Sequence, residues 1–192
     1  MFPLVVDLRH RRVLVIGAGR VGAQKINQLL NAGATVSVIT DEVSAPLAPE
    51  IASLVVRPYQ RGDLAGAFLV VSATGDSQVN DLIVAEANEL NILLNVVDDT
   101  ARSNFFFTAV HRDGDVVVSV STQGASPALA QWVRNVVAVT LPKNLASVAR
   151  RLRAERDALH GNEKSTENLE WMRRVQELID EDEDLKSANE AN

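Results

Sequence analysis

The chain has 192 residues, of which 46% are hydrophobic and 23% are charged, and its net charge is −6. It contains no cysteine, which excludes disulfides, thiolate metal sites and a cysteine nucleophile. No apolar run approaches the roughly 20 residues of a membrane span, and no Lys/Arg stripe interleaved with aromatic residues points to nucleic acid. We therefore expect that the protein binds neither a membrane nor nucleic acid, and that it is cytoplasmic.

The first half of the chain has the pattern of alternating strands and helices. Short apolar runs at 11–16, 35–40, 54–58, 68–73 and 92–97 predict strands, and the segments at 20–33 and 77–90 predict helices. Runs that are apolar throughout are typical of parallel strands covered on both faces. The expected fold class is therefore α/β, with a Rossmann-like, doubly wound parallel sheet that binds ligands at the carboxyl ends of its strands.

The pattern changes after residue 98. Asp113-Gly114 separates two segments of alternating apolar residues, which predicts a β-hairpin. Ser126 and Pro127 suit the N-cap and first position of a helix, and two further helical patterns follow. We expect a Rossmann-like domain at 1–104, a β-hairpin and helix dimerisation region at 105–142, a helical C-terminal region at 143–180 and an acidic, disordered tail at 181–192.

Gly17-Ala18-Gly19-Arg20-Val21-Gly22 lies between a predicted strand and a predicted helix. In this pattern Gly17 permits a tight turn, Gly19 lets a pyrophosphate approach the backbone, and Gly22 lets the helix pack closely on the strand. Unpaired N–H groups at the start of the helix would bind the phosphates. A turn kept only for packing would not readily explain three glycines at this spacing. We therefore predict a dinucleotide site, whose further candidate residues are Arg20, Val21 and Thr74.

The end of the second predicted strand bears on the choice of cofactor. An acidic residue there would accept hydrogen bonds from the adenosine ribose, whereas an arginine would favour a 2′-phosphate. The usual acidic position holds Thr40, and Asp41 and Glu42 follow it. Two carboxylates would repel the phosphate of NADP, so the sequence favours NAD.

Two adjacent carboxylates, Asp98 and Asp99, end the apolar run at 92–97. A carboxylate at the ligand-binding edge of the sheet could act as a general base or stabilise a cationic substrate. The alternative is that Asp98 only caps or turns the chain, as Asp often does. Of the two residues, Asp99 is the stronger candidate for forming a turn.

Four segments carry a more specific signal than the glycine pattern alone. They are MFPLVVDLRHRRVLVIGAGRVGAQK, VSATGDSQVN, NVVDD and VSVSTQGASPALA, which together span roughly residues 1–150. In this order they resemble the precorrin-2 dehydrogenase family of siroheme synthesis, some of whose members are also sirohydrochlorin ferrochelatases. The resemblance implies a homodimer that uses NAD+ to oxidise the tetrapyrrole precorrin-2 to sirohydrochlorin, in a cleft between the nucleotide domain and the dimerisation region.

The resemblance also assigns roles to residues. Asp98 matches the catalytic aspartate of the family by its place in NVVD. Ferrous iron is a further substrate in those members that insert it. The STQG turn replaces the more usual SSGG or STNG, and Thr122 keeps a hydroxyl group. The residues expected to bind the carboxylate-rich substrate are Asn95, Arg102, His111, Ser121, Thr122 and Gly124.

Other interpretations stay open on sequence alone. The three histidines, His10, His111 and His160, do not have the spacing of a metal site, so no resident metal is expected. The turn GAGRVG also suits an NAD-sensing regulatory module of the potassium channel and transporter type, although such a module would not need NVVDD or STQGASP. A dehydrogenase for another small substrate would need its own acid–base residues, and no His-Asp or Tyr-Lys arrangement stands out for that role.

Overall fold

The computed structural model describes residues 1–161 and 170–190. The chain forms two compact units, Met1–Phe106 and Phe107–Asn192, which are described here one at a time. The division falls next to the predicted end of the first domain at residue 104.

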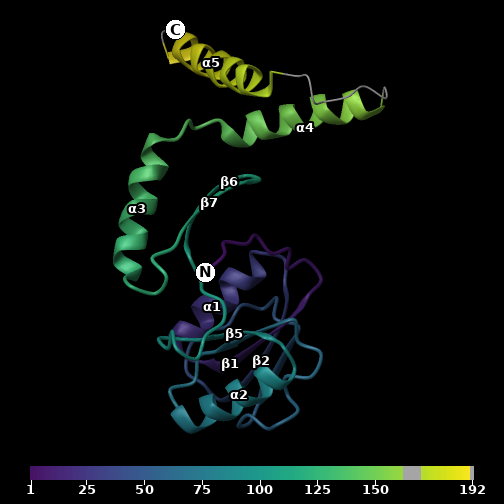
Figure 1. The fold of residues 1–192 in the computed structure, drawn as a ribbon, viewed down its shortest axis with the longest axis vertical. Coiled ribbons are helices and arrows are strands. Elements are labelled where there is room, and N and C mark those ends of the chain that lie inside the picture. Colours follow the sequence, from purple (N-terminus) through teal and green to yellow (C-terminus); the bar gives the residue numbers. More distant parts are fainter. Residues whose placement is uncertain (162–169, 191–192) are drawn as a thin grey trace. The chain divides into compact units, whose positions relative to one another are not determined.

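Unit 1 is a five-stranded parallel sheet with helices against it (Figure 1). The strands are β1 (Arg12–Ala18), β2 (Thr35–Val43), β3 (Ser53–Val56), β4 (Leu69–Ser72) and β5 (Leu93–Val96), in the spatial order β3-β2-β1-β4-β5. Helix α1 (Arg20–Leu30) connects β1 to β2, and α2 (Ser77–Glu89) connects β4 to β5. The predicted doubly wound α/β fold is confirmed.

The core of unit 1 is built around β1. Val13 to Ile16 are at most 3% exposed, because β2 and β4 flank this strand and side chains pack on both of its faces. Alternate residues of β1 face opposite sides of the sheet, and Leu14 and Ile16 belong to a buried cluster with Ile83 of α2. The apolar runs of the sequence therefore reflect a strand that solvent does not reach.

Strand β3 departs from the prediction of strands covered on both faces. It lies at the edge of the sheet and pairs with β2 alone. Leu54, Val55 and Val56 are 42%, 39% and 59% exposed. The apolar run at 54–58 correctly predicted a strand, but no element of unit 1 covers it, because the chain passes from β3 to β4 without a helix.

A buried carboxylate of α2 anchors the connection between β3 and β4. Glu86 accepts hydrogen bonds from the Tyr59 hydroxyl and from the backbone N–H groups of Gly62 and Leu64, the latter two at 2.9 and 3.1 Å. Burial and the neighbouring Glu86 carboxylate raise the pKa of Tyr59. Glu86 thus satisfies backbone groups that no strand pairs.

Unit 2 begins with an antiparallel hairpin of β6 (Ala109–Asp113) and β7 (Val116–Val120), followed by helix α3 (Pro127–Thr140). The two strands alternate between partly buried and exposed residues, as the sequence predicted. Ser126 caps α3 by accepting a hydrogen bond from the N–H of Leu129 at 3.1 Å, and Pro127 takes the first helical position. Both predictions at this helix start are confirmed.

Two long helices complete unit 2: α4 (Leu145–Gly161) and α5 (Trp171–Glu190). Asp113 of the hairpin accepts a hydrogen bond from the N–H of Ala146 at 3.0 Å, close to the start of α4. Arg174 of α5 pairs with Glu155 of α4 at 2.7 Å. Helix α5 continues through residues 181–190, which we had expected to be disordered; strong helix formers in this segment, such as Glu, Leu, Lys and Ala, support the extension. Residues 191–192 lie outside the described part of the chain.

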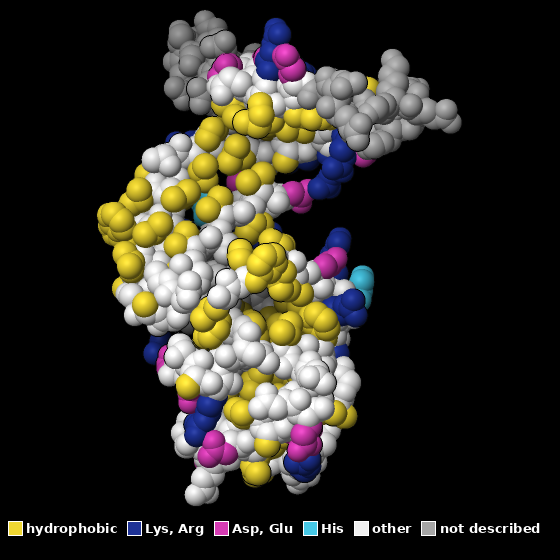
Figure 2. Space-filling view, in the orientation of Figure 1, with side chains coloured by type: hydrophobic (Ala, Val, Ile, Leu, Met, Phe, Trp, Pro, Cys, Tyr) yellow, Lys and Arg dark blue, Asp and Glu magenta, His cyan; other side chains and the backbone are white. Residues whose placement is uncertain are grey.

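One side of α3 is apolar and exposed. Leu129, Trp132, Val136 and Val139 follow helical spacing and are 51%, 63%, 42% and 83% exposed. Figure 2 shows hydrophobic side chains gathered over α3.

No helix among residues 1–161 and 170–190 combines the length and apolar character needed to cross a membrane.

Candidate functional site

The glycine turn joins β1 to α1 with very little space. Gly17 has φ +97°, and a Cβ atom on it would lie 2.7 Å from the carbonyl oxygen of Ala73. A Cβ atom on Gly22 would lie 2.2 Å from the carbonyl oxygen of Gly17. At Gly19, apart from adjacent residues, the only atom of the described chain within 4 Å of an added Cβ atom would be Ser44 Oγ, at 3.7 Å. Gly17 and Gly22 are therefore required by packing, whereas Gly19 borders open space that a ligand can enter.

The start of α1 is suited to an anion. Gly19 is the N-cap and offers no side chain to the free N–H groups of the first turn. The first turn also contains no acidic residue, and Arg20 is exposed there. The helix dipole favours negative charge at this end. Together with the space beside Gly19, these features fit the pyrophosphate of a dinucleotide.

Thr40 has a structural role beside the glycine turn. Its side chain is buried, and its Oγ1 accepts a hydrogen bond from the N–H of Ala18 at 3.1 Å and donates one to the carbonyl oxygen of Glu42. The hydroxyl group thus braces the glycine turn from within the fold, and a role of Thr40 in cofactor binding stays a prediction. Asp41 and Glu42 are exposed near the end of β2, so they remain the candidates for ribose binding.

Thr74 lies beside the glycine turn, as its predicted role requires. Its backbone nitrogen is 3.0 Å from the position that a Cβ atom of Gly17 would take. Its Oγ1 accepts a hydrogen bond from the N–H of Asp76, which in turn caps α2 through the N–H groups of Gln78 and Val79. The start of α2 is therefore closed by its own cap, in contrast to the open start of α1.

Asp98 lies in a turn directly after β5. The N–H of Asp99 donates to the carbonyl oxygen of Val96 at 3.1 Å, and Asp98 between them has φ +59°. Residues other than glycine seldom adopt this left-handed backbone, although Asp tolerates it better than most. The Asp98 carboxylate is exposed and makes no hydrogen bond within residues 1–161 and 170–190. The turn thus presents a carboxylate that the fold does not use.

Asp99 is bound within the same loop. It accepts a hydrogen bond from the N–H of Arg102 at 3.0 Å and pairs with the Arg102 guanidinium at 3.3 Å, and Arg102 also pairs with Asp81 of α2 at 2.6 Å. Asp99 therefore stabilises the loop, as expected. Arg102, which we had expected to bind substrate, already faces two carboxylates.

Asn95 is also engaged in the fold. It is buried in β5, and its Nδ2 donates to the carbonyl oxygen of Phe105 at 3.1 Å. It therefore helps to hold the chain after the Asp98 loop against β5. A role of Asn95 in substrate binding stays a prediction.

Lys25 of α1 is the last residue of the segment MFPLVVDLRHRRVLVIGAGRVGAQK, and no role was predicted for it. Lys25 is half-buried, and this burial lowers its pKa, while the carboxylate of Asp98 acts in the opposite direction. The signal in the sequence was a lysine placed among Gly22, Ile26 and Leu29, the residues of α1 that are buried.

The other predicted substrate residues lie in unit 2. His111 is partly buried in β6 opposite Val118. Thr122 Oγ1 accepts from the N–H of Ser126 and donates to its carbonyl oxygen, at 3.1 and 3.0 Å. Ser121 Oγ accepts from the N–H of Gln123, and Gly124 has φ +84°. These contacts shape the turn before α3, and the binding roles of the four residues stay predictions.

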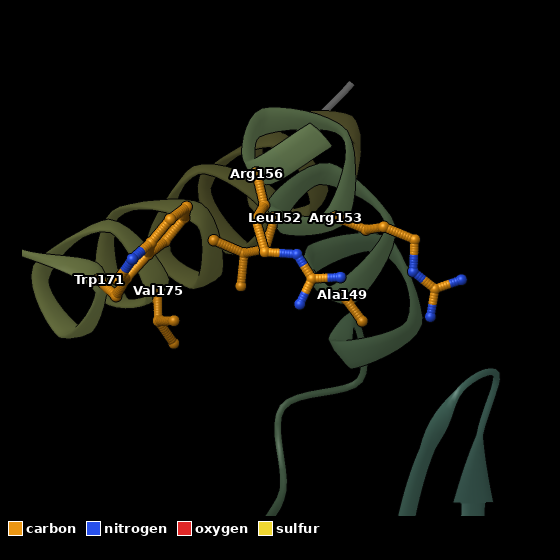
Figure 3. Close-up of a pocket in the computed structure, with 6 residues that line it drawn as sticks. All are labelled: Ala149, Leu152, Arg153, Arg156, Trp171 and Val175. Atoms are coloured by element: carbon orange, nitrogen blue, oxygen red, sulfur yellow. The ribbon is translucent and has the colours of Figure 1, made fainter. Parts of the chain in front are cut away.

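A cavity of about 470 Å³ lies between α4 and α5 (Figure 3). It is lined by Ala149, Leu152, Arg153, Arg156, Trp171 and Val175. None of the predicted site residues contributes to it.

Among residues 1–161 and 170–190, no cluster of three or more His, Asp or Glu side chains could hold a metal ion.

Comparisons with known proteins agree with a dinucleotide site at the glycine turn. Residues 4–109 match the protein family described as "Putative NAD(P)-binding". The siroheme synthases of Photorhabdus laumondii subsp. laumondii and Mannheimia succiniciproducens are each 35% identical, over 160 and 152 residues. Each match covers 77% of this chain and 32% of the relative, so the chain spans about a third of the length of these relatives. The solved structure of "SirC, precorrin-2 dehydrogenase" has a TM-score of 0.69 and 25% identity, and the match covers 94% of this chain and 88% of that one.

Proposed function

Because this chain belongs to the NAD(P)-binding family, we propose that it binds NAD+ at the glycine turn and uses it to oxidise precorrin-2 to sirohydrochlorin in siroheme biosynthesis. The similarity to siroheme synthases and to a precorrin-2 dehydrogenase supports this substrate. One observation carries the proposal. The open glycine turn follows β1 and the unused Asp98 carboxylate follows β5, and the carboxyl ends of parallel strands lie at the same edge of a sheet.

The charge near the end of β2 favours NAD over NADP. Asp41 and Glu42 are exposed there, and either could accept hydrogen bonds from the ribose. The double substitution of these residues to serine should therefore weaken NAD+ binding and reduce the preference over NADP+. Equal affinities of the wild-type protein for both cofactors would contradict this assignment.

The reaction removes two hydrogen atoms from the substrate. Bound NAD+ supplies the acceptor for one of them, which leaves with its electron pair as a hydride. The other leaves as a proton, which needs a base. Asp98 would accept this proton, because its carboxylate is exposed and without a hydrogen bond in the described chain. The same group could accept the pyrrole N–H protons that iron insertion displaces.

Further features belong to the same proposal. The substrate carries several carboxylates, so the cationic or hydrogen-bonding groups of unit 2, including His111 and the turn at 121–124, would contact it. Homodimer formation would cover the apolar side of α3, which is exposed in the single chain. Insertion of ferrous iron and a cytoplasmic location complete the proposal.

The direct test is turnover. Purified protein is incubated with NAD+ and precorrin-2 generated in situ, and the visible spectrum is followed for sirohydrochlorin. Asp98→Asn should lower kcat by at least about 100-fold and leave NAD+ affinity nearly unchanged, whereas the exposed carboxylate control Glu50→Gln should behave like the wild type. Ferrous iron added after the first reaction tests insertion.

The outcomes separate this function from its rival. Tight NAD+ binding without any turnover of precorrin-2 would favour the NAD-sensing module. Turnover by Asp98→Asn at the wild-type rate would show that the base lies elsewhere. Sedimentation of the wild-type protein as a monomer at micromolar concentration would remove the homodimer from the proposal.

A further inference from the structure

A bulge in β2 brings Ser44 to the glycine turn. Ile16 of β1 pairs with Ile39 of β2. The next pair is Ala18 with Val43, so one residue of β1 lies opposite three residues of β2. A bulge bends its strand and changes where the side chains after it lie. The strand therefore leaves its neighbour and returns to it at Val43, and Ser44 follows directly after this return.

Hydrogen bonds of Thr40 hold the bulge in place. The Thr40 hydroxyl accepts from the N–H of Ala18 at 3.1 Å and donates to the carbonyl oxygen of Glu42. The Thr40 carbonyl oxygen accepts from the N–H of Arg57, which follows β3, at 2.7 Å. These bonds join the bulge to the strands on both of its sides. The path of the chain into Ser44 is therefore fixed by the sheet.

The hydroxyl group of Ser44 lies beside Gly19 and is not used by the fold. Its Oγ is 3.7 Å from the position that a Cβ atom of Gly19 would take. Ser44 is exposed, and its hydroxyl makes no hydrogen bond within residues 1–161 and 170–190. A serine hydroxyl has one hydrogen to donate. This donor is available to a ligand that enters the open space at Gly19.

The pyrophosphate of the dinucleotide is the group that fits this donor. Gly19 is the position at which a pyrophosphate approaches the backbone. Helix α1 offers its free N–H groups there, and its N-cap has no side chain. The ionised carboxylates of Asp41 and Glu42 have no hydrogen to donate, so they suit ribose hydroxyls and not a phosphate. Ser44 would therefore add a side-chain donor to the backbone donors of α1.

We propose that Ser44 is a cofactor-binding residue, whose hydroxyl donates a hydrogen bond to the pyrophosphate of NAD+. This inference rests on the part of the proposed function that places NAD+ at the glycine turn. Asp41 and Glu42 accept hydrogen bonds from the ribose, and Ser44 donates one to a phosphate oxygen. The bulge thus gives the end of β2 both acceptors and a donor for the same cofactor.

The test is the NAD+ affinity of variants at residue 44, measured by isothermal titration calorimetry without tetrapyrrole. Ser44→Ala removes the donor and should weaken NAD+ binding by about tenfold, because hydrogen bonds to charged groups are among the stronger ones. Ser44→Thr keeps a hydroxyl group and should recover most of this loss. Ser53→Ala, which changes an exposed serine at the amino end of β3, should match the wild type. Urea denaturation should give equal stabilities for Ser44→Ala and the wild type, because the fold does not use the hydroxyl.

Ser44→Asp shows which part of the dinucleotide lies against residue 44. A carboxylate there would repel a phosphate, so NAD+ should bind about tenfold more weakly than to Ser44→Ala at low salt. Salt screens this repulsion, so the difference should shrink as the salt concentration rises. Against a ribose, the carboxylate would instead accept hydrogen bonds, and Ser44→Asp would bind at least as tightly as Ser44→Ala. That result, or wild-type affinity in Ser44→Ala, would overturn the proposal.

Failure of this inference can be told apart from failure of the proposed function. If the wild-type protein binds NAD+ but does not oxidise precorrin-2, the proposed function is rejected, and weaker binding by Ser44→Ala still supports the inference. If both proteins oxidise precorrin-2 with the same KM for NAD+, the proposed function stands and the inference is wrong. A wild-type protein that does not bind NAD+ would reject both.

Discussion

The substitution Gly22→Ala would test the packing of the glycine turn. An added Cβ atom would lie 2.2 Å from the carbonyl oxygen of Gly17, well inside the 3.0 Å that real Cβ contacts respect. Since the obstructing atom belongs to the backbone, the start of α1 must move away from β1. Overpacking of this kind costs about 1–3 kcal/mol, and the higher helix propensity of alanine offsets about 1 kcal/mol of it. We expect a lower free energy of unfolding and weaker NAD+ binding.

Gly19→Ala is the matched control, because its Cβ atom would lie in ordinary van der Waals contact with Ser44 Oγ, at 3.7 Å. Residue 19 has φ −75°, which alanine adopts readily, so stability should change by less than about 1 kcal/mol. The methyl group would nevertheless occupy the approach of the pyrophosphate, and NAD+ binding should weaken by about tenfold or more. Urea denaturation measures stability, and isothermal titration calorimetry measures NAD+ affinity. Wild-type stability in Gly22→Ala, or wild-type affinity in Gly19→Ala, would refute this reasoning.

Three further predictions concern unit 1. Thr40→Val leaves the N–H of Ala18 unpaired and should lower the free energy of unfolding by about 1–3 kcal/mol in urea denaturation. Glu86→Ala removes a buried acceptor of three hydrogen bonds and should cost at least about 3 kcal/mol; a melting temperature equal to that of the wild type would contradict it. Hydrogen bonds from Arg57 lower the pKa of Asp63, so this pair stabilises the fold above the ordinary Asp pKa and loses its contribution as the pH falls through the lowered value. Arg57→Gln should therefore flatten the acid dependence of the melting temperature.

The sequence predicted those parts of the fold that depend on local pattern. A run that is apolar at every position indicates a strand covered on both faces, and β1 is such a strand. The same pattern in β3 did not reveal that this strand lies at the edge of the sheet, because strand order depends on the connections. Helix α5 shows the opposite error: a charge run suggested disorder, whereas the backbone there is helical.

The candidate site divides in the same way. The roles of Gly17 and Gly22 followed from their spacing, because the turn that they form is local. Thr40 was singled out only because it holds the usual acidic position of the strand, and nothing in the sequence indicated that its hydroxyl bonds to a residue 22 positions away. Partners of this kind depend on how the strands are ordered, so the sequence alone could not pair them.

The anchoring of the β3–β4 connection by Glu86 bears on how this part of the protein opens. One side chain holds the amides of residues 62 and 64 against α2. These amides can exchange with deuterium only when the carboxylate releases them, so their exchange rates should rise and fall together. Proteolytic cleavage in the β3–β4 connection would likewise show that the connection has detached from α2, and would not indicate a surface loop that is flexible on its own.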